Sequence, residues 1–161
     1  MQHWKVLFVK PRTEKKVSEY CRLFGIHHYL PLRKKTRIIQ RRKVTVDLPL
    51  FPGYIFVRLH PSLRLQMLQS NLLVRILEPL KPRKMLRDLV MVRRALRVNP
   101  SLLTTRPLAK GMRVRIIAGP FMGTEGLVTR IAAKTKVTLN VDMIGQAVSF
   151  TTDSDFVEML N

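Results

Sequence analysis

The chain opens with a strand-like hydrophobic pattern that is followed by a helix-like one. Residues 4–9 alternate between two faces of a strand, and residues 14–24 carry apolar side chains at helical spacing. Thr13 is the expected N-cap of this helix, and Gly25 supplies the left-handed residue that ends it. The strand faces are Trp4, Val6 and Phe8 against Lys5, Leu7 and Val9, and the helix stripe is Val17, Tyr20, Cys21 and Phe24.

Strands and helices continue to alternate up to residue 97. We predict strands over residues 29–32, 50–59 and 74–77, a short helix after Ser62 and a long helix over 83–97. This order predicts an α+β domain in which helices flank an antiparallel sheet. The long helix should bury Met85, Leu89, Val92 and Leu96.

The remainder of the chain has a different pattern, with short strands separated by glycines. Such strands with little helical periodicity predict a small β-barrel over residues 108–161. The Pro-bounded polar stretch 98–107 is the expected linker, and residues 1–97 form the first domain. The predicted barrel strands cover residues 112–117, 127–132, 136–141 and 147–151.

Charge separates the same two parts. The chain has a net charge of +20, and residues 1–97 hold 23 Lys and Arg against 5 Asp and Glu. Residues 108–161 hold 6 against 5, so the first domain carries +18 and the second +1. A polyanionic partner is therefore expected for the first domain.

Several function classes are disfavoured by the composition. A single cysteine, Cys21, excludes an intrachain disulfide and a cysteine-based zinc site, and no apolar run is long enough to span a membrane. No HExxH, P-loop or GxSxG pattern is present. We therefore expect a cytoplasmic protein that is not an enzyme, has no metal, cofactor or membrane partner, and is monomeric.

The strongest candidate for nucleic-acid contact is the segment RKKTRIIQRRK at residues 33–43, which contains seven basic residues and no acid. As a two-stranded ribbon it could lie along a phosphate backbone and release counterions. A solvated hairpin and a protein or membrane partner are the alternatives. The basic residues are Arg33, Lys34, Lys35, Arg37, Arg41, Arg42 and Lys43.

The apolar stretch LFPGYIFV at residues 50–57 is the candidate protein-binding element. Its odd-numbered and even-numbered positions are both apolar, so both faces of the strand carry apolar side chains. If helices cover one face of the sheet, the apolar side chains of the other face point away from that core. An exposed aromatic patch containing Tyr54 and Phe56, extended by Phe8, is one interpretation. The alternative is a strand that is buried on both faces.

These residues resemble a known family. The segments WKVLFVKPRTE, YLPL and PLFPGYIFV resemble the N-terminal domain of NusG-family transcription elongation factors, and GMRVRIIAGPFMGTEGLV with LNVDMIGQAVSF resembles their KOW domain, an SH3-like barrel. The resemblance implies docking on the clamp helices of RNA polymerase and suppression of pausing and termination. It places the polymerase-binding residues at Phe8, Phe51, Tyr54 and Phe56.

The resemblance also implies further contacts. Lys10 and Arg12 match positions that contact non-template DNA in the specialised paralogue RfaH, and nascent RNA is the target in LoaP. The KOW domain of relatives recruits Rho or the ribosome, and we assign that surface to Phe121, Met143 and Ile144. Because the first domain is so basic, we expect a specialised antitermination paralogue of the RfaH/LoaP type. The alternative is a ribosome-associated KOW-type RNA-binding protein.

Overall fold

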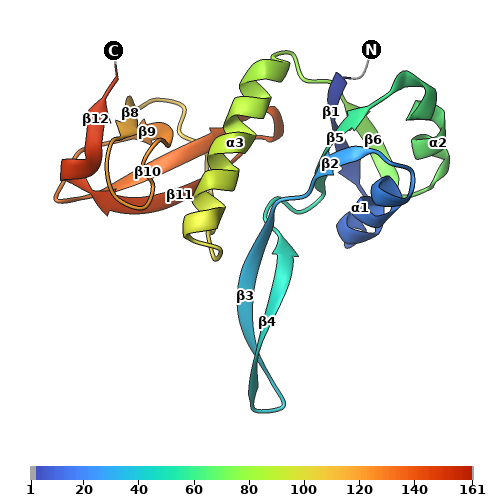
Figure 1. Cartoon of the computed structure of the whole chain (residues 1–161), viewed down its shortest axis with the longest axis horizontal. Helices are drawn as coiled ribbons and strands as arrows, with labels where there is room; N and C mark the ends of the chain where they lie inside the picture. The colour runs from blue at the N-terminus through green and yellow to red at the C-terminus, as the bar shows by residue number, and fades with distance from the viewer. Residues whose placement is uncertain (1–2, 161) are drawn as a thin grey trace. The chain divides into compact units, whose positions relative to one another are not determined.

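The computed structural model describes residues 3–160, and the chain divides into two compact units. The first unit comprises the chain up to Leu32 together with Pro49–Pro82. The second comprises Arg33–Leu48 and Arg83–Asn161. Figure 1 traces the chain through both, coloured from the N-terminus to the C-terminus.

The first unit contains the expected antiparallel sheet with helices packed on it. Its four strands are ordered β2-β5-β1-β6, and every pair is antiparallel. The structure thus confirms an antiparallel sheet accompanied by helices. The elements are β1 (His3–Val9), α1 (Glu14–Leu23), β2 (His27–Tyr29), β5 (Tyr54–Leu59), a 3₁₀ turn (Pro61–Leu63), α2 (Arg64–Gln69) and β6 (Leu73–Leu77).

One face of this sheet packs against α1. Leu7 of β1 and Ile55 of β5 lie in a buried cluster with Val17 and Cys21 of the helix. The alternation predicted for the first strand is therefore confirmed, since Leu7 and Val9 share this core. Burying each such side chain contributes about 1.5–3 kcal/mol.

The boundaries of α1 follow the prediction, but two details differ. Thr13 occupies the N-cap position, yet its hydroxyl donates a hydrogen bond to the Lys10 carbonyl (2.6 Å) and makes no cap bond to the helix. Gly25 ends the helix at φ +66°, as expected for a left-handed stop. Phe24 was expected in the core but is exposed and packs against the Tyr20 ring, with centroids 4.6 Å apart.

Two predicted strands have different bounds in the structure. The strand predicted over 29–32 ends at Tyr29, since Leu30 and Pro31 are irregular before the next strand begins. The strand predicted over 50–59 begins only at Tyr54, because Phe51–Gly53 form a turn with Gly53 at φ +90°.

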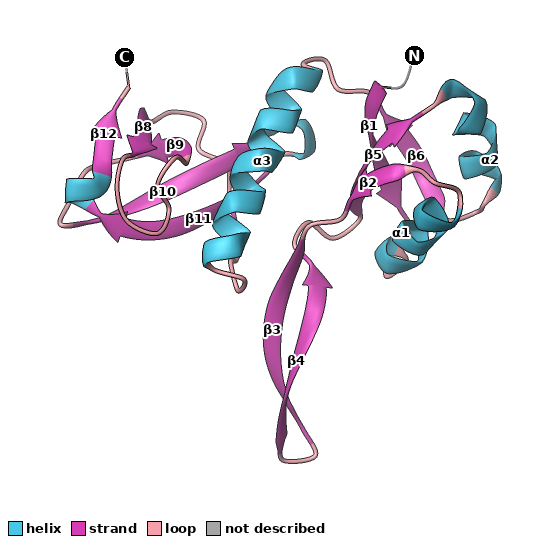
Figure 2. Ribbon diagram, in the orientation of Figure 1, coloured by secondary structure: helices cyan, strands magenta, loops and turns pink. Residues whose placement is uncertain are grey.

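The second unit contains the basic ribbon and a curled antiparallel sheet, which Figure 2 shows in magenta. The sheet has six strands in the order β12-β8-β9-β10-β11-β7 and resembles a half-barrel. Its last strand, β12, was not predicted. The elements are β3 (Leu32–Ile39), β4 (Arg42–Pro49), α3 (Pro82–Val98), β7 (Thr104–Thr105), β8 (Met112–Ile116), β9 (Glu125–Val128), β10 (Lys134–Val141), β11 (Gln146–Asp153) and β12 (Val157–Met159).

The expected linker and the long helix are both more involved in structure than the sequence indicates. Within residues 98–107, Thr104 and Thr105 pair with β11, and Leu102 is buried. Helix α3 buries Met85, Leu89 and Val92 as predicted, with Ala95 in place of Leu96. The compact units group α3 with the C-terminal strands, whereas the sequence placed it in the first domain.

No helix within residues 3–160 is long and apolar enough to cross a membrane.

Candidate functional site

An aromatic pair lies across two strands of the first unit. Phe8 of β1 is paired with Tyr54 of β5, and their ring centroids are 5.3 Å apart with the planes tilted by 36°. On the other side of β1, Phe8 is paired with Arg75, whose Cζ lies 5.9 Å from the Phe8 centroid. Both rings are partly exposed, so this pair presents aromatic surface beside the Arg75 guanidinium.

A buried carboxylate holds the turn beside this pair. Glu14, only 6% exposed, accepts a hydrogen bond from the Gly53 backbone N–H (3.0 Å). The Gly53 carbonyl in turn accepts from the Val9 N–H (2.8 Å). A Cβ added at Gly53 would lie 3.1 Å from Phe8 Cε2, so the absent side chain lets the Phe8 ring lie over the turn. The sequence carries no local signal for this contact, because Glu14 and Gly53 are 39 positions apart.

The other two predicted aromatics are not exposed. Phe51 and Phe56 are 1% and 0% exposed, so the expectation that Phe56 forms an exposed patch is wrong. The alternation of side chains along this strand is as predicted. Ile55 and Val57 lie in the cluster with α1, and Phe56 projects to the opposite face of the sheet. The error was to assume that this opposite face lacks cover, and the alternative of a strand buried on both faces is correct for Phe56.

The basic segment forms the predicted two-stranded ribbon, β3 paired with β4. Every residue from Lys34 to Thr45 is exposed, including Ile38 at 75%. The turn falls at Gln40 and Arg41, which have φ of 49° and 63°. All seven predicted basic residues lie on this ribbon: Arg33, Lys34, Lys35, Arg37, Arg41, Arg42 and Lys43.

The two remaining predicted nucleic-acid contacts lie in the other unit. Lys10 and Arg12 are exposed in the turn between β1 and α1, where Arg12 has φ +62°. The backbone N–H of Lys10 donates to the Leu72 carbonyl (2.9 Å), which fixes the start of this turn while the Lys10 side chain is exposed. The predicted cations therefore belong to two different compact units.

The residues expected to bind a partner of the C-terminal domain are less exposed than their neighbours. Phe121 is half-buried and stacks on Phe150, with centroids 3.9 Å apart. Ile144 is buried and Met143 is half-buried on a short 3₁₀ turn. Met122 is 66% exposed and was not among the predicted partner-binding residues. Its position next to Phe121 in the sequence could have indicated it.

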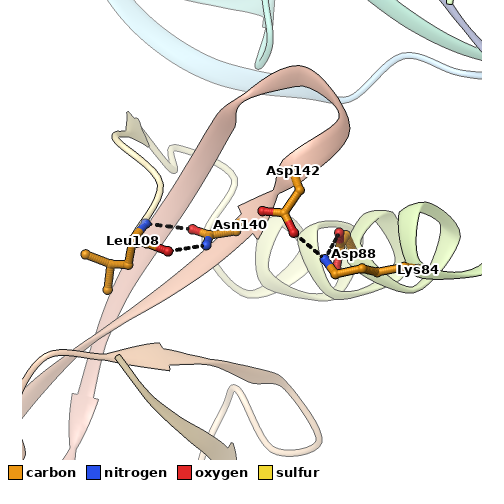
Figure 3. A network of polar contacts seen from close by, with 5 residues as sticks. All are labelled: Lys84, Asp88, Leu108, Asn140 and Asp142. Carbon is orange, nitrogen blue, oxygen red and sulfur yellow. Dashed lines mark hydrogen bonds and ion pairs between the residues drawn. The ribbon is translucent and has the colours of Figure 1, made fainter. Parts of the chain in front are cut away.

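A polar network joins α3 to the C-terminal sheet within the second unit (Figure 3). Lys84 Nζ lies 2.6 Å from Asp142 and 3.0 Å from Asp88. Burial opposes the charge on Lys84, but the hydrogen bonds to both carboxylates outweigh it and raise the pKa of Lys84. Burial raises the pKa of Asp88, and the ion pair with Lys84 only partly offsets it. These ion pairs fix one end of α3 to the C-terminal strands.

Asn140 holds the segment before β8 in place. Its side-chain amide forms two hydrogen bonds with the Leu108 backbone, of 3.0 and 2.8 Å.

His28 and Cys21, two side chains of types that often take part in catalysis, have structural roles here. His28 accepts from or donates to the Ser18 hydroxyl (2.7 Å) and bonds the Ile26 carbonyl (3.0 Å). Burial raises the pKa of the Cys21 thiol to about 11, which keeps it protonated and unreactive near neutral pH. Among residues 3–160, no group of three or more His, Cys, Asp or Glu side chains is placed to hold a metal ion.

Comparison with known proteins identifies the family. A family model described as "Transcription termination factor nusG" matches residues 2–99. The solved structure "Domain interaction in Thermotoga maritima NusG" is 20% identical, covers 100% of this chain and 98% of its own, and superposes with a TM-score of 0.52, which shows a shared fold. The structure "Crystal Structure of MjSpt4:Spt5 complex conformation B" is 15% identical, covers 98% and 97%, and has a TM-score of 0.31, too low to add to the fold assignment.

The matched residues include the aromatic pair, the Glu14–Gly53 contact, the basic ribbon and α3. They span more than half of the 161-residue chain. The chain therefore belongs to the NusG family of transcription factors, and like the rest of that family it is not an enzyme.

Proposed function

We propose that this protein is a specialised transcription elongation and antitermination factor of the RfaH/LoaP type, acting in the cytoplasm as a monomer. It docks on the clamp helices of RNA polymerase, suppresses pausing and termination, and contacts DNA or nascent RNA through its basic residues. Membership of the NusG family supports the transcription role. The charge of +18 on residues 1–97 supports a specialised role with nucleic-acid contact.

The observation that carries the docking proposal is the partly exposed Phe8–Tyr54 pair above a fixed turn. Aromatic side chains held in place before binding lose little conformational freedom when they enter a partner's groove. We assign direct contact to Phe8 and Tyr54. Phe51 and Phe56 are buried, so their proposed part in polymerase binding is to support the shape of this surface.

Core RNA polymerase pull-down with the full chain tests this docking. Phe8→Ala with Tyr54→Ala should weaken binding by roughly 30-fold or more, as expected for a buried aromatic hot spot worth about 2 kcal/mol. Tyr20→Ala with Phe24→Ala is the matched control, because it removes another touching Tyr–Phe pair, at the C-terminal end of α1. Equal binding by both double variants, each folded, would contradict the docking assignment.

The consequence for transcription is a separate measurement. By holding the clamp closed, the protein shifts the population of polymerase away from the paused state. Transcription in vitro through a pause site and a terminator should show shorter pauses and more read-through with the wild-type protein, and less of both effects with the Phe8/Tyr54 variant. Sedimentation with ribosomes in the absence of polymerase binding would instead favour the ribosome-associated alternative.

We further propose that the C-terminal strands form a KOW-type, SH3-like domain that recruits Rho or the ribosome. Its near-neutral charge suits a protein partner. Phe121, Met143 and Ile144 remain the assigned residues, and the exposed Met122 beside the Phe121–Phe150 stack extends that surface.

A further inference from the structure

The pairing of the ribbon strands fixes which residues share a face. Gln40 and Arg41 form a two-residue loop with both φ angles positive, the signature of a type I′ turn. Such a turn places Ile39 opposite Arg42, and counting back along the strands places Lys34 opposite Asp47. The ion pair between Lys34 and Asp47 (3.2 Å) agrees with this register.

The register divides the charges of the ribbon unequally. In an antiparallel pair, residues directly opposite one another point to the same face, and alternate residues point to opposite faces. One face, which we call the cationic face, carries four basic residues and no acid. The other face has two basic residues, and one of them is paired with Asp47. The cationic face consists of Arg33, Lys35, Arg37 and Ile39 from β3 and Arg42, Val44, Val46 and Leu48 from β4.

The cations on this face are regularly spaced and available. Arg33, Lys35 and Arg37 lie on alternate positions of one strand, about 6.7 Å apart. Lys35, Arg37 and Arg42 are exposed and form no ion pair with an acid among residues 3–160. The valines of β4 lie beside them in a parallel row. A row of free cations next to an apolar row suits a ligand with repeated negative charges beside apolar surface, as a nucleic acid has.

We propose that the cationic face binds duplex DNA, with the ribbon lying in the major groove. This inference rests on the proposed nucleic-acid contact of the ribbon and assigns it to one face and one ligand. The major groove of B-form DNA is about 12 Å wide and admits a two-stranded ribbon, whereas that of A-form RNA is too narrow to admit side chains. Residues 32–49 contain no aromatic side chain, and stacking on aromatics is the usual means of holding single strands.

The test compares two variants of the full chain that remove equal charge. Lys35→Gln with Arg37→Gln removes two of the four cations of the cationic face. Arg41→Gln with Lys43→Gln removes the cation of the turn and the one cation of the opposite face that is not paired with Asp47. Binding to a fluorescent random-sequence DNA duplex is measured by anisotropy across a salt titration. We expect the slope of log affinity against log salt to fall by about 1.8 for the first variant, at about 0.9 per lost phosphate contact, and by less than about 0.5 for the second.

A third variant keeps composition and net charge unchanged. Lys35→Thr with Thr36→Lys moves one cation to the opposite face, and the slope should fall by about 0.9. Because residues 34–45 are exposed, all three variants should keep the wild-type unfolding midpoint and the wild-type polymerase pull-down.

Each other outcome overturns the inference in an identifiable way. Equal loss from both double variants would show contact without a preferred face. No loss from either, with a steep wild-type slope, would place the DNA contact elsewhere. Tighter, face-dependent binding to an RNA hairpin or to single-stranded DNA would contradict the duplex assignment. Absence of any wild-type binding to nucleic acid would overturn the proposed nucleic-acid contact as well, while leaving polymerase docking to its own test.

Discussion

Two neighbouring stretches of the chain have opposite surroundings. The ribbon ends at Pro49, and β5 begins at Tyr54 after a single turn. Ile55, Phe56 and Val57 are all fully buried, so β5 is covered on both faces, whereas both faces of the ribbon are exposed between Lys34 and Thr45. The buried strand therefore contributes to packing and to the shape of its neighbours. The exposed ribbon leaves its charged side chains accessible to solvent.

The largest expected effect comes from removing a buried ring. Phe56→Ala should lower the free energy of unfolding by about 3–5 kcal/mol, because it removes a fully buried aromatic and leaves a cavity. Val44→Ala on the exposed part of the ribbon should change it by less than about 0.5 kcal/mol. Chemical denaturation of both variants measures the difference. Similar values for the two would contradict the contrast between buried strand and exposed ribbon.

A smaller effect is expected from the carboxylate that holds the turn. Glu14→Ala leaves the buried Gly53 N–H without its acceptor and should cost about 1–3 kcal/mol of unfolding free energy. Glu14→Gln keeps an acceptor oxygen and should cost less. The Ala variant should also weaken polymerase binding in proportion to disorder at Phe8 and Tyr54. If the alanine and glutamine variants unfolded together, the hydrogen bond would not be what Glu14 contributes.

A contrast of similar size compares two residues with positive φ. Gly53→Ala places a Cβ 3.1 Å from Phe8 Cε2 at φ +90°, and we expect a cost of about 1–3 kcal/mol. Arg41→Gly puts the residue preferred at φ +63° into the exposed ribbon turn and should change global stability by no more than about 0.5 kcal/mol. Thermal unfolding of both variants checks this. A lower unfolding temperature for Arg41→Gly would show that the ribbon turn contributes to the global stability of the protein.

Much of the local structure could be predicted from the sequence because it depends on short-range patterns. Alternation in residues 4–9 gave the two faces of β1, and the apolar stripe of residues 83–97 gave the buried side of α3. The basic segment was correctly expected to form a ribbon. The turn at Gln40–Arg41 was harder to place, since neither residue is among the usual Asn or Gly of such turns.

The candidate site was predicted only in part, because its geometry depends on residues far apart in the sequence. Phe8 and Tyr54 were nominated and do lie together. Glu14 was not, since its hydrogen bond to Gly53 spans 39 positions and leaves no local signal. Phe56 was expected to be exposed and is buried, because whether the second face of a strand is covered depends on elements elsewhere in the chain.

By itself, the sequence determined the difference in charge between residues 1–97 and 108–161, the order of most elements and the resemblance to the NusG family. All three follow from residue types in linear order. Tertiary structure alone decided that Phe56 is buried, that Glu14 holds the Gly53 turn, and that four of the ribbon cations share one face. The reason is physical. Burial and register depend on which strands and helices pack together. Alternation along the sequence shows which side chains share a face of a strand, but not which face another element will cover.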